Sequence, residues 1–262
     1  MQNEIDAVFN KKNGLKLMTH VVAGYPDLRT SLKLVALMAG KGADLIEIQI
    51  PFSDPLADGP TIVRANHRAL RNGIRPKDCF EMVRTLKDEV PVPLILMTYA
   101  NIPFQMGIDR FAASAAEAGA GGVILPDLPF DEKESREFAH FKRAGIHLIP
   151  VLSPGMDDRR LQNILKKASG LLYLTLRVGT TGAVTHFDRA GLDFLHCVRK
   201  RTGLPLAAGF GISSSEQLKI LQDRVDAAVI GSHLINVFDA QGLKGVGAFL
   251  DECRGLTAPT VA

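Results

Sequence analysis

Short aliphatic runs recur along the whole chain, each followed by a longer amphipathic stretch, and this alternation restricts the possible folds more than any other feature. The runs consist mostly of Leu, Ile, Val and Ala and do not alternate with polar residues. That pattern is typical of strands buried on both faces of a parallel sheet. We expect eight such strands: Leu17–Val22, Leu45–Ile50, Leu94–Thr98, Gly122–Leu125, His147–Leu152, Leu171–Leu176, Leu206–Ala208 and Ala227–Ile230.

The stretches between these runs have the spacing of amphipathic helices. Leu32, Val35, Ala36 and Ala39, for example, fall on one helical face. Several stretches begin at Asp or Ser, the residues that helix N-caps prefer. The expected helices are Leu28–Lys41, Thr61–Arg71, Pro76–Glu89, Asp131–Ala144, Asp157–Ala168, Ala190–Thr202, Ser214–Asp223 and Leu243–Arg254.

Strands that alternate with helices predict a parallel sheet, either closed into a barrel or open and doubly wound. The chain has 262 residues, close to the roughly 250 that are typical of a (β/α)8 barrel. We therefore predict an α/β fold of the (β/α)8 TIM-barrel type, with residues 1–262 in one domain and an extra N-terminal helix. An open doubly wound sheet is the alternative.

Two of the predicted βα loops are long. Pro51–Gly73 follows the second strand, and the Gly/Thr-rich segment Arg177–Phe187 follows the sixth. Active sites of barrels lie on the βα loops at the carboxyl ends of the strands, and long loops in compact domains are usually functional. Both loops are therefore candidates for covering a substrate.

A carboxylate interrupts the second strand. Leu45, Glu47 and Gln49 share one face of this strand, while the isoleucines between them share the other. An ionised carboxylate is costly to bury unless it is paired. Glu47 is therefore either a general acid or base that faces the barrel interior or one half of a structural salt bridge to a helix.

The loop after this strand is rich in proline and carries two further carboxylates. Asp54 and Asp58 lie within Pro51–Pro60, and three prolines and a glycine restrict the conformations of this segment. Asp before Pro or Gly often serves only to form a turn. Because the loop leaves the strand that carries Glu47, two carboxylates can also converge on one cavity, as acid–base catalysis requires.

Glycine and serine follow the seventh and eighth strands, at Gly209–Ser215 and Gly231–Ser232. Ser213 and Glu216 have the spacing of a capping box. A helix N-terminus with free backbone N–H groups attracts phosphate, and barrel phosphate sites are often built from these two loops. We predict a phosphate site here; two ordinary helix caps are the alternative.

Several classes of function are excluded by what the sequence lacks. The net charge of +3 gives no basis for nucleic-acid binding, and no apolar run approaches the ~20 residues that span a membrane. The seven histidines have no metal-ligand spacing, so no metal is expected. A nucleotide-binding Gly-x-x-x-x-Gly-Lys loop is absent. Three scattered cysteines and a polar N-terminus predict a soluble, cytoplasmic protein.

Glu47 followed by Pro51–Ile62 resembles the signature of the tryptophan synthase alpha subunit family. The ten residues from Pro51 to Pro60 are a highly specific part of that signature. Further segments resemble the family in the same order along the chain: Ala23–Asp27, Met97–Asn101, Pro126–Pro129, Thr180–Gly182, Gly209–Ser213 and Gly231–Ser232.

The resemblance implies a carbon–carbon lyase that splits indole-3-glycerol phosphate into indole and glyceraldehyde 3-phosphate without a cofactor in this chain. By position, Glu47 would protonate the ring carbon that bears the side chain, and Asp58 would accept the ring N–H. Tyr173 would position Glu47, and Thr181 would close the sixth-strand loop over Asp58. The implied phosphate ligands are Gly182, Gly211, Gly231 and Ser232, and the implied indole-pocket residues are Phe210, Met97 and His20.

The resemblance also implies a partner. Alpha subunits bind a beta subunit that carries pyridoxal phosphate, in an α2β2 heterotetramer through which indole passes. Pro51, Phe52 and Asp54 would then lie at the interface between the two subunits, and the pyridoxal cofactor would belong to the partner alone.

Some positions depart from the family pattern. Gln49 stands where the family has glycine, His20 stands where it has an aromatic residue, and residues 176–182 include Val178 in an altered Leu-Arg-Val-Gly-Thr-Thr-Gly loop. These departures leave two alternatives open. One is a lyase that acts alone or on another phosphorylated substrate, and the other is a catalytically poor scaffold for a beta subunit. The joint presence of Glu47 and Asp58 with Tyr173 and Thr181 argues against the scaffold.

Overall fold

The apolar runs form one parallel sheet in the computed structural model, which describes residues 3–10, 14–128, 137–176, 189–209 and 211–257. The nine strands lie in the order β5-β4-β3-β2-β1-β9-β8-β7-β6. Their bounds are β1 Lys16–Val22, β2 Leu45–Gln49, β3 Leu94–Met97, β4 Gly122–Ile124, β5 His147–Ile149, β6 Val151–Leu152, β7 Leu172–Thr175, β8 Leu206–Gly209 and β9 Ala227–Ile230.

The two ends of this strand order are joined by the chain itself, because only Pro150 separates β5 from β6. The N–H of His147 donates to the Gly121 carbonyl on the β4 side (3.1 Å), and the N–H of Tyr173 donates to the Pro150 carbonyl on the β7 side (3.0 Å). The predicted strand His147–Leu152 therefore pairs first with one neighbour and then with the other, and the sheet closes into a barrel. The closed-barrel prediction is confirmed, and the doubly wound alternative is wrong.

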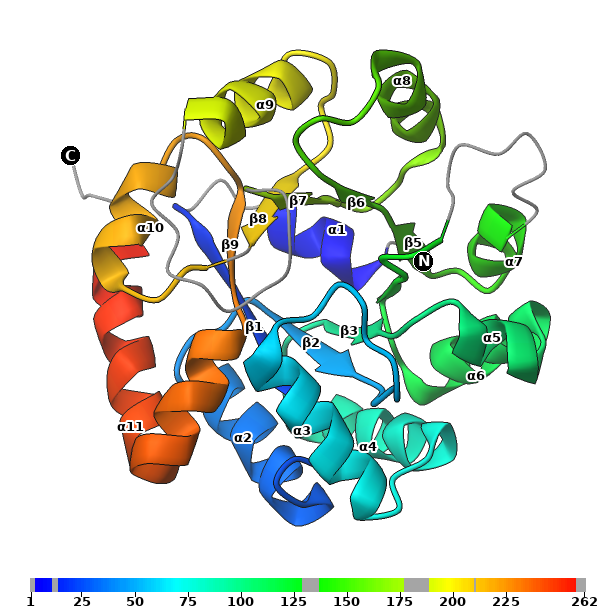
Figure 1. Cartoon of the computed structure of the whole chain (residues 1–262), viewed down its shortest axis with the longest axis vertical. Coiled ribbons are helices and arrows are strands. Elements are labelled where there is room, and N and C mark those ends of the chain that lie inside the picture. The colour runs from blue at the N-terminus through cyan, green and yellow to red at the C-terminus, as the bar shows by residue number, and fades with distance from the viewer. Residues whose placement is uncertain (1–2, 11–13, 129–136, 177–188, 210, 258–262) are drawn as a thin grey trace.

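The helices surround the barrel (Figure 1). The sequence does not predict the two helices between β3 and β4, α5 and α6. The alanine-rich α6 has few large apolar residues to reveal its buried face. The predicted helix Asp131–Ala144 is described only from residue 137. The bounds are α1 Glu4–Phe9, α2 Leu28–Gly40, α3 Pro60–Arg71, α4 Pro76–Glu89, α5 Asn101–Met106, α6 Ile108–Ala118, α7 Glu137–Arg143, α8 Asp158–Lys167, α9 Arg189–Arg199, α10 Ser215–Leu221 and α11 Ser232–Thr257.

The final helix is longer than expected. The sequence predicts a helix over Leu243–Arg254, whereas α11 begins eleven residues earlier, at Ser232. Its backbone leaves the helical conformation at Gly242, where φ is 65° and ψ is −160°. The predicted helix corresponds to the part after this kink, and the part before it starts directly after β9.

Two apolar layers flank the strands, because alternate side chains point to opposite faces of a strand. Ile46 and Ile48 of β2, and Ile50 directly after it, belong to the larger layer between the sheet and the helices. Leu45 belongs to a second layer that fills the barrel interior, together with Met18 and other inward-facing residues. Since Glu47 and Gln49 alternate with the outward isoleucines, their side chains face the interior.

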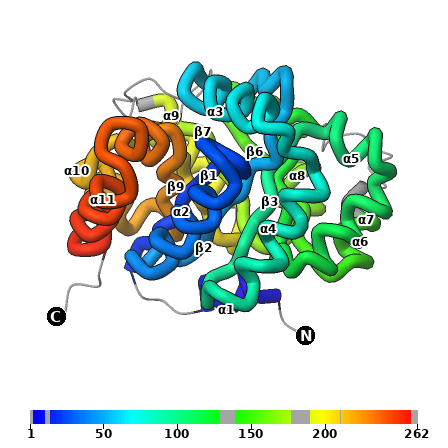
Figure 2. The backbone as a smooth tube through the Cα atoms, turned by 90° about the horizontal axis from the view of Figure 1, so that it is seen from below, coloured from blue at the N-terminus to red at the C-terminus, as the bar shows by residue number. Residues whose placement is uncertain are grey.

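The predicted N-terminal helix is present and plugs one end of the barrel. Ile5 of α1 is fully buried within the interior layer. Asn3 caps the helix by accepting from the N–H of Ile5 (2.9 Å), and its amide donates to the Gly121 carbonyl (2.8 Å). Figure 2 shows α1 at the end of the barrel opposite α3. The interior is thus closed at the amino ends of the strands, and the open end lies at their carboxyl ends.

Candidate active site

A cavity of about 210 Å³ opens at the carboxyl ends of the strands. Its walls combine two carboxylates, several apolar side chains and two glycine-containing turns. The lining residues are His20, Glu47, Ala57, Asp58, Ile62, Met97, Ile124, Pro126, Val151, Ser153, Tyr173, Thr175, Gly211, Ile212, Val229, Gly231 and Ser232.

Glu47 is buried at the wall of this cavity, with 4% of its surface exposed. Its Oε1 lies 3.0 Å from Nδ1 of His20 on the neighbouring strand β1. The two residues meet because the parallel register of β1 and β2 places their Cα atoms opposite each other. The alternative of a structural salt bridge from Glu47 to a surrounding helix is therefore wrong, since its partner is another residue inside the barrel.

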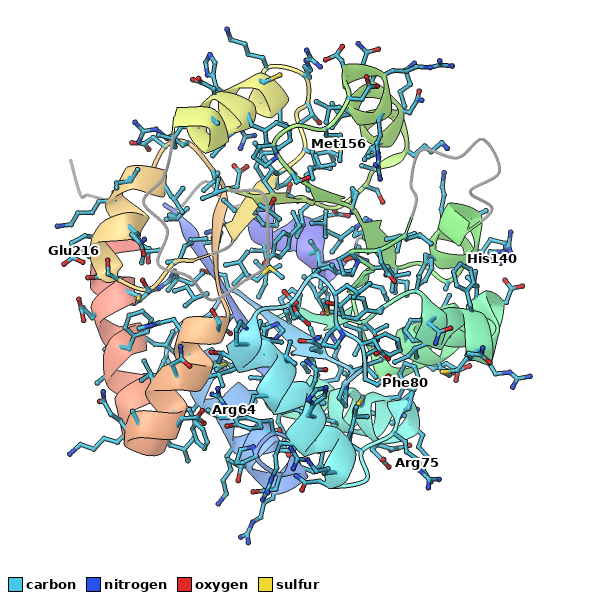
Figure 3. The ribbon with its side chains drawn as sticks, in the orientation of Figure 1. Arg64, Arg75, Phe80, His140, Met156 and Glu216 are labelled. Carbon is cyan, nitrogen blue, oxygen red and sulfur yellow. The ribbon has the colours of Figure 1, made fainter. Side chains whose placement is uncertain are left out.

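The Glu47 carboxylate changes the acidity of His20. Burial lowers the pKa of this imidazole, but the neighbouring Glu47, Asp58 and Gln49 together outweigh burial, with Glu47 contributing most, so that the pKa of His20 is raised above its ordinary value. Arg75, His140 and Glu216, by contrast, lie at the outer rim of the molecule (Figure 3). The carboxylates of the cavity therefore find their partners among interior residues.

Asp58 reaches the same cavity from the loop between β2 and α3, with 8% of its surface exposed. Burial raises the pKa of this carboxyl, and the hydrogen bond from Gln49 opposes the rise. Nε2 of Gln49 donates to Oδ2 of Asp58 across 2.8 Å. The structure thus brings Glu47 and Asp58 together in one cavity, with His20 of β1 beside Glu47 and Gln49 of β2 bonded to Asp58.

Tyr99, directly beyond β3, anchors the loop that carries Asp58. Its ring stacks on Phe52, with centroids 5.3 Å apart and planes inclined by 24°. Its hydroxyl accepts from the N–H of Ala57 across 3.0 Å. Sequence reasoning assigned no role to Tyr99, although the residue lies within a matched segment, because its contact with the loop requires strands β2 and β3 to be adjacent.

The tip of the same loop is exposed, in contrast to its anchored base. Leu56 is 84% exposed, and Asp54 is also exposed, its carboxylate accepting a hydrogen bond from the hydroxyl of Ser53. Pro51 is buried, and Phe52 is half-buried against Tyr99. The predicted partner-facing residues therefore differ in accessibility: Asp54 is available to another molecule, whereas Pro51 supports the base of the loop.

Tyr173 projects from β7 into the cavity. Burial, reinforced by the charges of Glu47 and Asp58, raises its pKa well above the ordinary value, so its hydroxyl stays protonated. The ring lies directly over Gly209 of β8, where an added Cβ would come within 2.5 Å of the Tyr173 hydroxyl. Glycine at position 209 therefore leaves the space that this ring occupies.

The predicted phosphate residues Gly211, Gly231 and Ser232 line one side of the cavity. Gly211 has a φ of 87°, a left-handed conformation that favours glycine. The capping box expected at Ser213 is shifted by one residue: Ser214 is the N-cap of α10, and Gln217 provides the reciprocal side chain. Phe210, Thr181 and Gly182 lie outside the described residues.

Met97 and His20 also line the cavity, as the resemblance implies for a site that binds an indole ring. Among the described residues, no group of His, Cys, Asp and Glu has a geometry that could hold a metal ion. No helix within the described segments is long and apolar enough to cross a membrane. The arrangement therefore suits proton transfer by two carboxylates at the centre of the barrel, with the glycine-containing turns at one side.

A family model for the tryptophan synthase alpha chain matches residues 7–248. The chain belongs to this family. The alpha chain of Syntrophotalea carbinolica is 40% identical over 91% of this chain and 94% of its own length, and that of Petrotoga mobilis is 40% identical over 97% of both. The two buried carboxylates therefore lie in the cavity of a member of the alpha-chain lyase family.

Solved structures of the family have the same fold. A tryptophan synthase structure from Mycobacterium tuberculosis superimposes with a TM-score of 0.91 at 28% identity, covering 99% of this chain and 100% of that one. The alpha subunit from Legionella pneumophila gives a TM-score of 0.85 at 33% identity, covering 98% of this chain and 99% of that one. The barrel is therefore the fold of the alpha-chain family.

Proposed function

We propose that this chain is the alpha subunit of a tryptophan synthase, a lyase that cleaves indole-3-glycerol phosphate into indole and glyceraldehyde 3-phosphate. The observation that carries the proposal is the convergence of Glu47 and Asp58 on one cavity in a member of the alpha-chain family. Two buried carboxylates of separate origin meet the need of this reaction for one acid and one base.

The cleavage requires the indole ring to accept electrons before the carbon–carbon bond breaks. Glu47 protonates the ring carbon that bears the side chain, while Asp58 accepts the ring N–H proton, which gives an indolenine. The Glu47 carboxylate then accepts the proton of the adjacent side-chain hydroxyl as the carbon that bears this hydroxyl becomes the aldehyde. The electrons of the broken bond return to the ring, the ring nitrogen regains its proton, and indole leaves.

Other residues of the cavity bind and enclose the substrate in this proposal. Met97 and His20 contact the indole, and Tyr173 supplies a protonated hydroxyl beside Glu47. Gly211, Gly231 and Ser232 hold the phosphate together with Gly182. Family membership supports the same assignments for Phe210 in the indole pocket and for Thr181 in closure over Asp58.

The proposal includes a beta subunit as partner, in an α2β2 complex that forms in the cytoplasm. The exposed tip of the loop after β2, with Leu56 and Asp54, supports docking there, and Phe52 and Pro51 support the loop from below. The chemistry assigned to this chain uses acid–base groups alone, and family membership supports assigning pyridoxal phosphate to the beta subunit.

His20 and Gln49 stand where the resemblance implies an aromatic residue and glycine, and they favour a second candidate, the cleavage of a different phosphorylated substrate. Both side chains are buried beside the reacting carboxylates, with exposed fractions of 4% and 0%. His20 adds polar atoms to the wall of the cavity, and Gln49 holds the Asp58 carboxylate from behind that wall. A substrate with a more polar ring than indole would gain hydrogen bonds there.

Turnover of indole-3-glycerol phosphate by the purified chain, with and without a beta subunit, tests the proposal. We expect slow release of indole that rises when the partner is added. Glu47→Gln should fold normally and lose about 10²-fold or more of the turnover, the scale of a positioned acid–base group. Near-normal turnover in that variant would remove Glu47 from the reaction.

The phosphate assignment is tested with the dephosphorylated substrate, which should bind far more weakly. Equal binding of the two compounds would overturn that assignment. Absence of cleavage by folded protein under both conditions would reject indole-3-glycerol phosphate as the substrate and leave the second candidate.

A further inference from the structure

His20 and Glu47 form a buried pair that joins two neighbouring strands at the wall of the cavity. They are direct register partners of β1 and β2. Nδ1 of His20 lies 3.0 Å from Oε1 of Glu47, and each side chain is 5% exposed. Because both backbones are fixed within a parallel sheet, the contact is part of the framework of the barrel.

The remaining polar atoms of the pair are unpartnered. Nε2 of His20 and Oε2 of Glu47 are buried and have no hydrogen-bond partner within the part of the chain that the structure describes. Both residues line the cavity. A buried polar atom without a hydrogen-bond partner destabilises the folded protein. We therefore expect a polar group of a bound molecule to contact these two atoms in the cavity.

We propose that His20 is a positioning residue for Glu47 and that the two side chains act as one proton-donating pair. The inference rests on the proposed cleavage. Nδ1 of His20 fixes the Glu47 carboxyl and shares one proton with it. Glu47 passes that proton to the ring carbon, which leaves a neutral imidazole beside a carboxylate. The pair then takes a proton from the side-chain hydroxyl as the carbon–carbon bond breaks, so it ends the cycle as it began.

The pair keeps its proton to higher pH than a lone imidazole does. The titratable groups that face His20 are Glu47 and Asp58, with Tyr173 facing the same two carboxylates across the cavity. From β9 and the turn after it, Val229 and Gly231 face the cavity without charge. The negative charges of Glu47 and Asp58 therefore favour the protonated imidazole, and they raise the pKa of His20 despite its burial.

Two variants separate positioning from proton sharing. His20→Phe removes both the hydrogen bond and the titrating group. His20→Asn places an amide nitrogen where Nδ1 lies, since the two atoms are equally many bonds from Cα, but the amide does not titrate and so cannot share a proton with Glu47. The assay is indole release from indole-3-glycerol phosphate with a beta subunit present, measured as kcat and KM across the pH range.

In His20→Phe we expect kcat to fall about 10-fold or more, a part of the effect of a positioned acid–base group, with KM changed by less than about 3-fold. The alkaline limb of its pH profile should move to lower pH by about one unit or more. His20→Asn should recover much of kcat at acid pH and keep the displaced limb. Recovery of the wild-type limb in His20→Asn, or an unchanged limb in both variants, would overturn proton sharing.

A second measurement tests the pair without relying on activity. The imidazole of His20, identified by its loss in His20→Asn, is titrated by nuclear magnetic resonance in the wild type and in Glu47→Gln. We expect its pKa to lie above the ordinary value in the wild type and below it in Glu47→Gln, because burial is then less opposed. The other six histidines report that the fold is intact.

The two measurements distinguish the two possible failures. Equal titration of His20 in the wild type and in Glu47→Gln would overturn the pair. Absence of indole release by the wild type, together with the expected titration, would overturn the proposed cleavage and retain the pair for the second candidate substrate.

Discussion

Replacement of Gln49 by methionine tests how the cavity controls the charge of Asp58. Methionine retains the length of the side chain and removes the amide that donates to Oδ2 of Asp58 at 2.8 Å. A hydrogen bond to a charged group contributes about 1.5–3 kcal/mol, and one pKa unit corresponds to about 1.4 kcal/mol. Since burial already raises the pKa of Asp58, loss of this bond should raise it further by about one to two units.

The sign of the pH effect follows from the role of Asp58 as a base. Activity requires the ionised carboxylate and is lost as the pH falls through the Asp58 pKa. In Gln49→Met the acid limb of kcat should therefore move to higher pH by about one to two units. The measurement is indole release with a beta subunit, followed across the pH range for the wild type and the variant.

The same change appears in the unfolding equilibrium. An acid whose pKa is raised on folding binds its proton more tightly in the folded state, so stability falls as the pH rises from the unfolded pKa through the folded pKa. Gln49→Met should add a loss of about 1.5–3 kcal/mol that is complete above the new Asp58 pKa and absent at low pH. Comparison of two pH values removes the pH-independent effect of deleting the buried, unpartnered Oε1 of Gln49.

A matched control is available on the same strand. Ile48 is fully buried in the layer under the helices, so Ile48→Val should cost about 0.5–1.5 kcal/mol and leave the acid limb where it is in the wild type. An acid limb of Gln49→Met that coincides with the wild-type limb would refute the reasoning. A displaced limb in Ile48→Val would show that any repacking of β2 moves it.

Three further substitutions probe the supports of the cavity. Tyr99→Phe leaves the N–H of Ala57 without its acceptor and should cost about 1 kcal/mol of stability and roughly 10-fold in kcat. An unchanged kcat would show that Tyr99 does not place the loop for catalysis. Gly209→Ala should cost about 1–3 kcal/mol, because its Cβ would lie 2.5 Å from the Tyr173 hydroxyl, and a variant as stable and active as the wild type in denaturant and rate assays would contradict that packing. Ile5→Ala should cost about 2–5 kcal/mol in urea unfolding and leave the pH profile of activity unchanged, since α1 lies at the closed end of the barrel. A shifted profile would show that packing at the closed end affects the active site.

Most strands and helices could be predicted because their signals are local. A run such as Leu45–Gln49 carries its own hydrophobic pattern, and Pro76–Glu89 matches the observed helix at both ends because proline and the spacing of its buried face define it. The helix Ile108–Ala118 was not predicted because alanine fills most of its buried face. The division of His147–Leu152 into two strands also has no local signal, because it reflects pairing with two different neighbours.

The sequence by itself determined that Glu47 and Gln49 share a face, that Asp58 follows them in a stiff loop, and that glycine-containing turns follow the seventh and eighth predicted strands. Only the tertiary structure decided that this face looks inward, that His20 is the partner of Glu47, and that Gln49 holds Asp58. Periodicity is a property of each strand alone. The inward direction depends on closure of the sheet, the His20–Glu47 contact depends on the register between β1 and β2, and the Gln49–Asp58 contact depends on the path of the loop after β2. Register and closure both arise from pairing between strands, as between His20 and Glu47, which are 27 positions apart, and no local pattern records that pairing.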